Sequence, residues 1–444
     1  MLDKRFWNMT HMTIRRKLDA GERFFWLLDR VSGMNFVVFA ELACRLDVAQ
    51  VNAVLQEAQQ AHPLLCVKIV HKGEDELWFE SADLPLTTHI RTVNQENWQS
   101  AIEQEMSHVF ALDEAPLLRC LLLEFGDAER SVLALTFQHA IADGRSGTTL
   151  LREILGRLFN PAQAVFAKPA AHPPMHTVFP EKYHWHKQPE AAIQLGEIRK
   201  AELKRHGRPV TLPWLDQLAP QRLPRFERIE LATEETARLL KHCKQQGATL
   251  HGVLGAAQLL AKFKSIAADT PLTFSLGSPA DMRPYLEGEI PTTSLGLYVS
   301  LLFSTYQVSI GQDFWELARS VGSDIKRQLA RGDGHLLFAQ VKPDAFPPTD
   351  EGIAAFGKMM LASPQSSMIS NIGVVEPVPG ADQVESISFV LCPMPYQLMF
   401  SAVSTFKGRL IINLAYDAGK LGADKAQQFT NWIRQALLEA AARG

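Results

Sequence analysis

The sequence has few cysteines, and none of them is spaced for metal binding or redox chemistry. The five cysteines are scattered along 444 residues without a Cys-x-x-Cys pair (Cys44, Cys66, Cys120, Cys243 and Cys392). An odd number of scattered thiols argues against a disulfide framework and against a zinc site. The N-terminus also lacks the apolar core of an export signal. We therefore expect a cytoplasmic protein.

The sequence also has little net charge and no long segment of purely apolar residues. The formal net charge is −3 and 46% of the residues are hydrophobic, so nothing favours binding to nucleic acid or to an anionic membrane. Two long uncharged stretches, 290–312 and 386–406, contain prolines. They predict buried strands and no transmembrane segment.

The length of the chain suits two domains of about 200 residues each. Strand and helix patterns alternate within residues 1–160 and again within 226–444, whereas 161–225 are dense in proline and histidine. The pattern predicts an N-terminal subdomain, a crossover segment and a C-terminal subdomain with these bounds. The close pair His184 and His186 lies in the crossover without a carboxylate at helical spacing, so we expect no metal site.

Residues 136–147, TFQHAIADGRSG, follow a strand pattern and raise three interpretations. The simplest is a turn with a core histidine, and the second is a catalytic base at a cleft. On a helix, His139 and Asp143 would instead share a face as metal ligands, but Asp-Gly is typical of turns. In a turn, Gly144 would allow the backbone to bend at a position where the Cβ of any other residue would clash. A histidine there can take a proton near pH 7.

The segment resembles the HxxxDG signature of the CoA-dependent acyltransferase superfamily. That group includes peptide condensation domains, chloramphenicol acetyltransferase and polyketide-associated acyltransferases. Four further stretches resemble its motifs in chain order: GATLHGVLGAAQLLA (247–261), SLGSPADMRPYL (275–286), SSMISNIG (366–373) and MFSAVSTFKGRLIINLAYD (399–417). The resemblance implies an α/β fold of two chloramphenicol-acetyltransferase-like domains with mixed sheets and an active-site tunnel at their interface.

The resemblance also implies roles for individual residues. His139 would be the general base that deprotonates the acceptor, which attacks the thioester without an acyl-enzyme. Asp143 and Gly144 would be structural, and Arg283 is the expected partner of Asp143, because an unpaired buried carboxylate costs several kcal/mol. Two polar residues, Ser370 and Asn371, are candidate oxyanion donors, unless they are ordinary polar positions of a strand.

The function implied is acyl transfer in lipid, polyketide or other secondary metabolism. The donor would be acyl-CoA or a phosphopantetheinyl acyl carrier protein acting in trans, with no other cofactor, and the acceptor a small-molecule hydroxyl. Gln138 stands where peptide condensation domains carry a second histidine, which favours an ester product. An amide-forming enzyme with an amine acceptor and a non-catalytic docking relative stay open. A basic run is either solvated or contacts CoA phosphates or a carrier (Arg199, Lys200, Lys204, Arg205 and Arg208).

Overall fold

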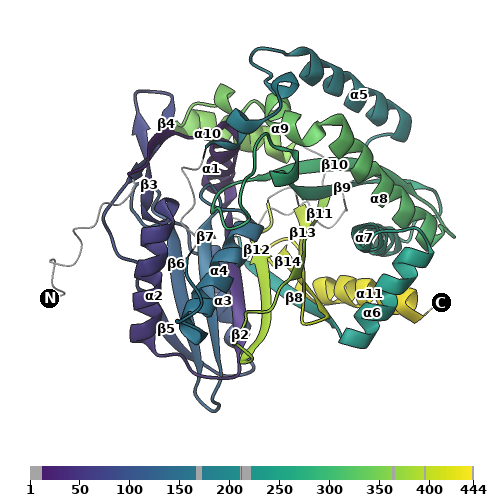
Figure 1. Cartoon of the computed structure of the whole chain (residues 1–444). Coiled ribbons are helices and arrows are strands. Elements are labelled where there is room, and N and C mark those ends of the chain that lie inside the picture. Colours follow the sequence, from purple (N-terminus) through teal and green to yellow (C-terminus); the bar gives the residue numbers. More distant parts are fainter. Residues whose placement is uncertain are drawn as a thin grey trace.

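Two large mixed sheets lie side by side and carry helices on their outer faces (Figure 1). The computed structural model describes residues 13–166, 173–210, 212, 222–362, 366–394 and 397–442. The first lobe contains a five-stranded sheet of order β12-β2-β7-β6-β5, and the second a six-stranded sheet of order β10-β9-β11-β13-β14-β8. A three-stranded sheet, β1-β4-β3, flanks the first lobe. The α/β class with mixed sheets is therefore as predicted.

The first part of the chain builds most of the first lobe. Its helix α2 begins after Asp47, whose carboxylate accepts a hydrogen bond from the amide of Ala49. Strands β6 and β7 pair antiparallel and form a hairpin. The elements are β1 (Arg15–Lys17), α1 (Ala20–Ser32), β2 (Asn35–Leu42), α2 (Val48–Ala61), η2 (Pro63–Cys66), β3 (Val67–Lys72), β4 (Glu76–Ser81), β5 (Thr88–Val93), α3 (Trp98–Ser107), β6 (Leu118–Phe125), β7 (Ser131–Gln138) and α4 (Gly144–Phe159).

The proline-dense segment contains a long helix that the sequence pattern did not predict. It includes the short helices η3 (Met175–Val178) and η4 (Glu181–Tyr183), and then α5 (Glu190–His206). Helix α5 buries only Ala192 and Leu195. Because so few of its residues face the core, its apolar residues show no helical stripe. Residues 167–172, 211 and 213–221 of the crossover lie outside the described residues.

The second part of the chain builds the six-stranded sheet. Thr249 caps α7, and β13 and β14 form a hairpin through Lys407 and Gly408, whose φ angles of 48° and 79° suit a two-residue turn. The elements are β8 (Pro224–Leu231), α6 (Thr233–Gln245), α7 (Leu250–Ile266), β9 (Leu272–Asp281), η6 (Arg283–Tyr285), β10 (Val299–Val308), α8 (Phe314–Arg331), α9 (Asp333–Val341), η7 (Pro343–Ala345), α10 (Asp350–Leu361), β11 (Ser366–Val375), β12 (Val384–Leu391), β13 (Gln397–Phe406), β14 (Arg409–Asp417) and α11 (Ala423–Ala442).

Late segments of the chain cross to the first lobe. Strand β12 pairs antiparallel with β2 and so joins the five-stranded sheet. Helices α9 and α10 pack against α1. The boundary at 225/226 stays a prediction, but these crossings mean that residues from both parts of the chain surround the space between the sheets.

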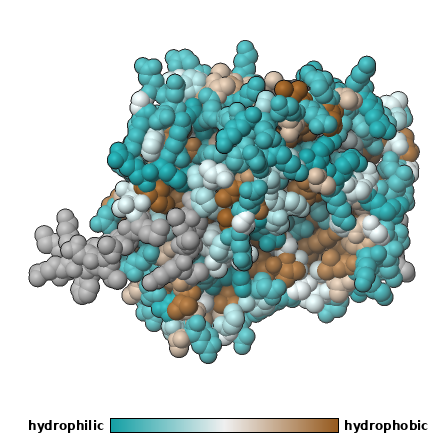
Figure 2. All heavy atoms as spheres, turned by 45° about the horizontal axis from the view of Figure 1, so that its top comes forward, coloured by the Kyte–Doolittle hydropathy of each residue, from teal (hydrophilic) through white to brown (hydrophobic). Residues whose placement is uncertain are grey.

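The surface is largely polar. In the view of Figure 2, hydrophilic residues cover most of the face, and hydrophobic residues appear in small patches between them. Among the described residues, no helix combines the length and apolar character needed to cross a bilayer.

Candidate active site between the two sheets

The TFQHAIADGRSG segment is a strand, a turn and the start of a helix. Strand β7 ends at Gln138, and α4 begins at Gly144. The Gln138 side chain accepts a 2.7 Å hydrogen bond from the amide of Ala140, and Asp143 caps α4 by accepting a 2.8 Å bond from the amide of Ser146. The strand–turn interpretation is therefore correct, and the helical one is wrong.

The glycine that the packing requires is not the one predicted. A Cβ on Gly144 would lie 3.4 Å from Phe389, which is ordinary contact, and Gly144 does not have a positive φ. A Cβ on Gly147 would lie 2.8 Å from the ring of Phe36 and 2.9 Å from Val38. The steric requirement assigned to Gly144 thus falls on Gly147, where α4 crosses β2 closely.

His139 is enclosed by aromatic rings. Only 7% of the residue is exposed, and its ring stacks on Phe25 of α1 with centroids 4.1 Å apart and planes 18° apart. Phe36 of β2 lies 4.9 Å away in a tilted arrangement. Burial lowers the pKa of His139 to about 4, and the backbone and the Asp143 carboxylate oppose this only weakly. The imidazole is therefore neutral at pH 7.

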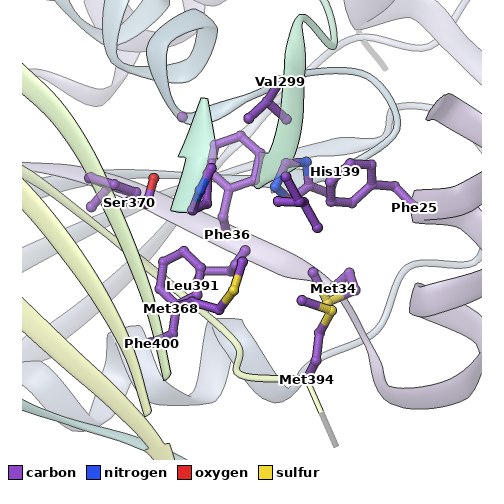
Figure 3. A pocket seen from close by; sticks show the side chains of 14 residues that line it. Phe25, Met34, Phe36, His139, Val299, Met368, Ser370, Leu391, Met394 and Phe400 are labelled. Atoms are coloured by element: carbon purple, nitrogen blue, oxygen red, sulfur yellow. The ribbon is translucent and has the colours of Figure 1, made fainter. Parts of the chain in front are cut away.

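A small apolar cavity lies beside His139 (Figure 3). Its volume is about 40 Å³, which is space for roughly one water molecule. Both sheets and α1 contribute to its wall, and sulfur and aromatic side chains dominate it (Phe25, Met34, Phe36, Met368, Phe389, Met394 and Phe400). Methionine side chains adapt their shape easily, so this wall can yield to a larger occupant.

Arg283 pairs with Asp143 below the turn. Its Nη1 lies 3.1 Å from Asp143 Oδ2 and 3.0 Å from Asp281 Oδ1, and its Nη2 donates a 2.8 Å hydrogen bond to the hydroxyl of Ser146. Burial opposes the charge of Arg283, but the two carboxylates outweigh it and raise the pKa of the guanidinium. The turn of the first lobe is thus joined to η6, which follows β9, by a buried ion pair.

Asp143 also joins the turn to the loop before β10. Its Oδ2 accepts a 2.8 Å bond from the amide of Tyr298, and its own amide donates to the carbonyl of Gly296 over 3.1 Å. The hydroxyl of Ser146 donates to the same carbonyl over 2.8 Å. Because these bonds fix both sides of the turn, the direction of His139 is set by the second lobe as well as by its own strand.

The two candidate oxyanion donors differ in their access to the His139 cavity. Ser370 of β11 lines the His139 cavity (Figure 3). Asn371 lines an adjoining cavity beside Asp143 and Arg283, and its Oδ1 accepts a 2.9 Å bond from the amide of Gly373. Ser370 lines this adjoining cavity as well, but of the two residues only Ser370 also lines the His139 cavity.

Sequence reasoning missed Phe25, Met34 and Met394. Each is an apolar residue within an apolar stretch, and nothing in the local pattern separates a cavity wall from an ordinary core position. Their role follows from contacts between segments far apart in the chain.

Metal ligands are not gathered in the described residues: no group of three or more His, Cys, Asp or Glu could hold an ion. His184, one of the pair considered above, bonds through Nε2 to the carbonyl of Phe179 over 2.8 Å. In the basic run, Lys204, Arg205 and Arg208 are exposed on or after α5, whereas Arg199 lies at a cavity wall.

Two helix-flanked mixed sheets with a buried histidine between them define a condensation-domain-like fold. Residues 220–415 match the family described as phthiocerol/phthiodiolone dimycocerosyl transferase C-terminus. The structure resembles polyketide synthase associated protein 5 from Mycobacterium tuberculosis, with a TM-score of 0.66, 16% identity, and coverage of 98% of this chain and 100% of that one. It also resembles the first condensation domain of the CDA synthetase, with a TM-score of 0.70, 14% identity and 97% coverage of each chain.

A curated relative shares one stretch with the chain. Chondramide synthase of Chondromyces crocatus is 31% identical over 116 residues, which are 24% of this chain and 3% of that synthase. The chain therefore spans a small fraction of the length of this relative. The family match over residues 220–415 and the likeness of fold agree with the resemblance that the sequence showed to condensation-domain-like acyltransferases.

Proposed function

We propose that this protein transfers an acyl group from a CoA or carrier-protein thioester to a hydroxyl acceptor, with His139 as the general base. The observation that carries the proposal is a neutral, buried histidine in the wall of an apolar cavity between the two lobes. An uncharged imidazole has a lone pair for the proton, and apolar walls exclude the water that would hydrolyse a thioester. The burial that keeps the imidazole uncharged also makes it a weaker base.

The proposed reaction is a direct displacement. The acceptor oxygen attacks the thioester carbonyl carbon while its proton passes to the imidazole of His139. The carbon–sulfur bond then breaks, and the leaving thiolate takes the proton back. The hydroxyl of Ser370 lies at the same cavity and is the candidate donor to the oxyanion. Asp143 and Arg283 act through the turn and are positioning residues.

An ester is favoured over an amide by Gln138. Its side chain accepts a bond from the backbone of the turn and is fully buried, so it offers no second base to an amine acceptor. Amide formation is the second candidate, because a peptide condensation domain shares the fold. Matched alcohol and amine acceptors of one carbon skeleton, offered with the same acyl donor, separate the two.

The decisive variant is His139→Ala. A positioned base contributes about 10²–10⁴-fold to the rate, so we expect turnover to fall by that factor, or about 3–5 kcal/mol of transition-state stabilisation. The loss should appear mainly in kcat, because the base contacts the reacting proton and not the remote parts of the donor. Turnover and melting temperature are measured on the same preparation.

His242→Ala is the matched control. His242 is also buried, but it lies on α6 and its Nδ1 bonds to the carbonyl of Ala440 over 2.9 Å, remote from the His139 cavity. This variant should lose stability and keep its turnover. Near-wild-type turnover in His139→Ala with an unchanged melting point would place the base elsewhere. If neither acyl-CoA nor acylated carriers support transfer to any alcohol or amine, the protein is a non-catalytic relative.

A further inference from the structure

A second and larger cavity is reached by α1, and two consecutive residues of this helix line one cavity each. Phe24 lines this cavity, whereas the next residue, Phe25, stacks on His139. Its volume is about 360 Å³, within the range of small-molecule sites. It lies between α1, α5, α9, α10 and the edge strand β10, and Arg199 of the basic run lines it.

The walls of this cavity are mainly apolar at the base and polar toward α5. Apolar side chains come from α1, β10, α9 and α10 (Phe24, Phe303, Leu337, Val341, Met359 and Met360). Leu203 of α5 also lines the cavity and is 46% exposed, which places an opening beside that helix. The cavity therefore suits a ligand with an apolar body whose polar end reaches α5.

Arg199 of α5 is a cation without a close anion at this wall. Burial lowers the pKa of its guanidinium, and its Nη2 has no hydrogen-bond partner in the described part of the chain. It forms no ion pair with a described residue. Asp333, the acid that attracts it most, is held by Arg331 through a 2.6 Å bond from Nε. A desolvated cation in this position is costly unless an anion joins it.

The charge around Arg199 limits the ligand to a single negative charge. Glu202 lines the same cavity, and its Oε1 lies 3.9 Å from Nη1 of Arg331. A monoanion would balance Arg199, whereas a dianion such as a phosphate monoester would place excess negative charge beside Glu202. The fork of an arginine matches the two oxygens of a carboxylate.

We propose that this cavity binds an amphipathic monocarboxylate, with the carboxylate on Arg199 and the apolar chain against Phe24 and Leu337. At about 30 Å³ for each water-sized group, 360 Å³ accommodates roughly a dozen non-hydrogen atoms. A saturated carboxylate of about ten carbons has this size. Binding is independent of the proposed acyl transfer, so it can be measured without turnover.

The test uses decanoate as the probe and isothermal titration calorimetry as the readout. Decanoate should bind the full chain, and decanol and decylamine should bind at least tenfold more weakly. Arg199→Gln should weaken decanoate binding by about 10–100-fold, as expected for the loss of charge-assisted hydrogen bonds. Its melting temperature should stay the same or rise, because an unpaired buried charge is removed.

Two further variants complete the test. Arg205→Gln changes an exposed arginine of the same helix and should leave decanoate binding unchanged. Val341→Trp fills the cavity from a half-buried position and should abolish binding. The proposal is overturned if decanoate fails to bind at millimolar concentration, if decanol binds equally well, or if either Arg199→Gln or Val341→Trp retains wild-type affinity.

Discussion

Replacing Asp143 with alanine should lower the free energy of unfolding by about 3–5 kcal/mol. The change removes three interactions: the cap on the amide of Ser146 at 2.8 Å, the acceptor for the amide of Tyr298 at 2.8 Å, and the partner of Arg283 at 3.1 Å. A lost cap costs about 1 kcal/mol, and an unsatisfied buried N–H about 1–3 kcal/mol. Breaking a buried ion pair costs about 3–5 kcal/mol.

These contributions share one carboxylate, so they do not add fully. Asp281 stays 3.0 Å from Arg283 and reduces the cost of the lost pair. The total loss in free energy of unfolding is therefore close to the cost of breaking the ion pair alone. Asp143→Asn should be milder, because the amide oxygen can still cap α4. Urea denaturation followed by circular dichroism measures both variants.

Asp47→Ala is the matched control. Asp47 caps α2 through one 2.8 Å bond to the amide of Ala49, but it is exposed and has no buried cation. The free energy of unfolding of Asp47→Ala should be lower than that of the wild type by about 1 kcal/mol. If Asp143→Ala costs no more than Asp47→Ala, the ion pair adds nothing and the reasoning fails. If Asp143→Ala keeps its stability but loses turnover, Asp143 has a chemical role and not a positioning one.

Three further results are expected. As the pH falls from 6.5 to about 4, the unfolded chain protonates His139 before the native protein does, which destabilises the wild type. The difference in free energy of unfolding between wild type and His139→Ala should therefore shrink over this range in denaturation curves. A constant difference would contradict the lowered pKa. Phe25→Leu should admit water to the imidazole and raise the pKa of His139, so the acid limb of the pH profile of kcat/KM should move toward neutral pH. An unmoved limb would mean that the stack on Phe25 does not control the pKa of His139. Gly147→Ala should cost about 1–3 kcal/mol through contact with Phe36 and Val38, and a melting temperature equal to that of wild type would show that α4 can shift away.

The local elements and the turn at His139 were predictable from the sequence. The strand pattern before His139 and the turn chemistry of Asp143-Gly144 each describe interactions within a few residues, and the structure has β7 and the turn in those places. The resemblance of five stretches in order also pointed to the two-lobed fold. Helix α5 escaped prediction because it buries so little of its surface.

The environment of the histidine depended on tertiary structure. Phe25 lies more than 300 residues from Met368 and Met394 in the sequence. The three meet at one cavity because β12 joins the first sheet and α9 and α10 pack on α1. The pKa of His139 follows from that enclosure, and no local pattern encodes it. The same holds for Arg199: the sequence left open whether its basic run is solvated or contacts a ligand, whereas packing of α5 against β10 and α9 places Arg199 at a cavity wall, where its Nη2 has no hydrogen-bond partner among the described residues. Sequence thus determined which groups can do chemistry, and long-range packing decided which of them are desolvated, because burial is a property of the assembled lobes.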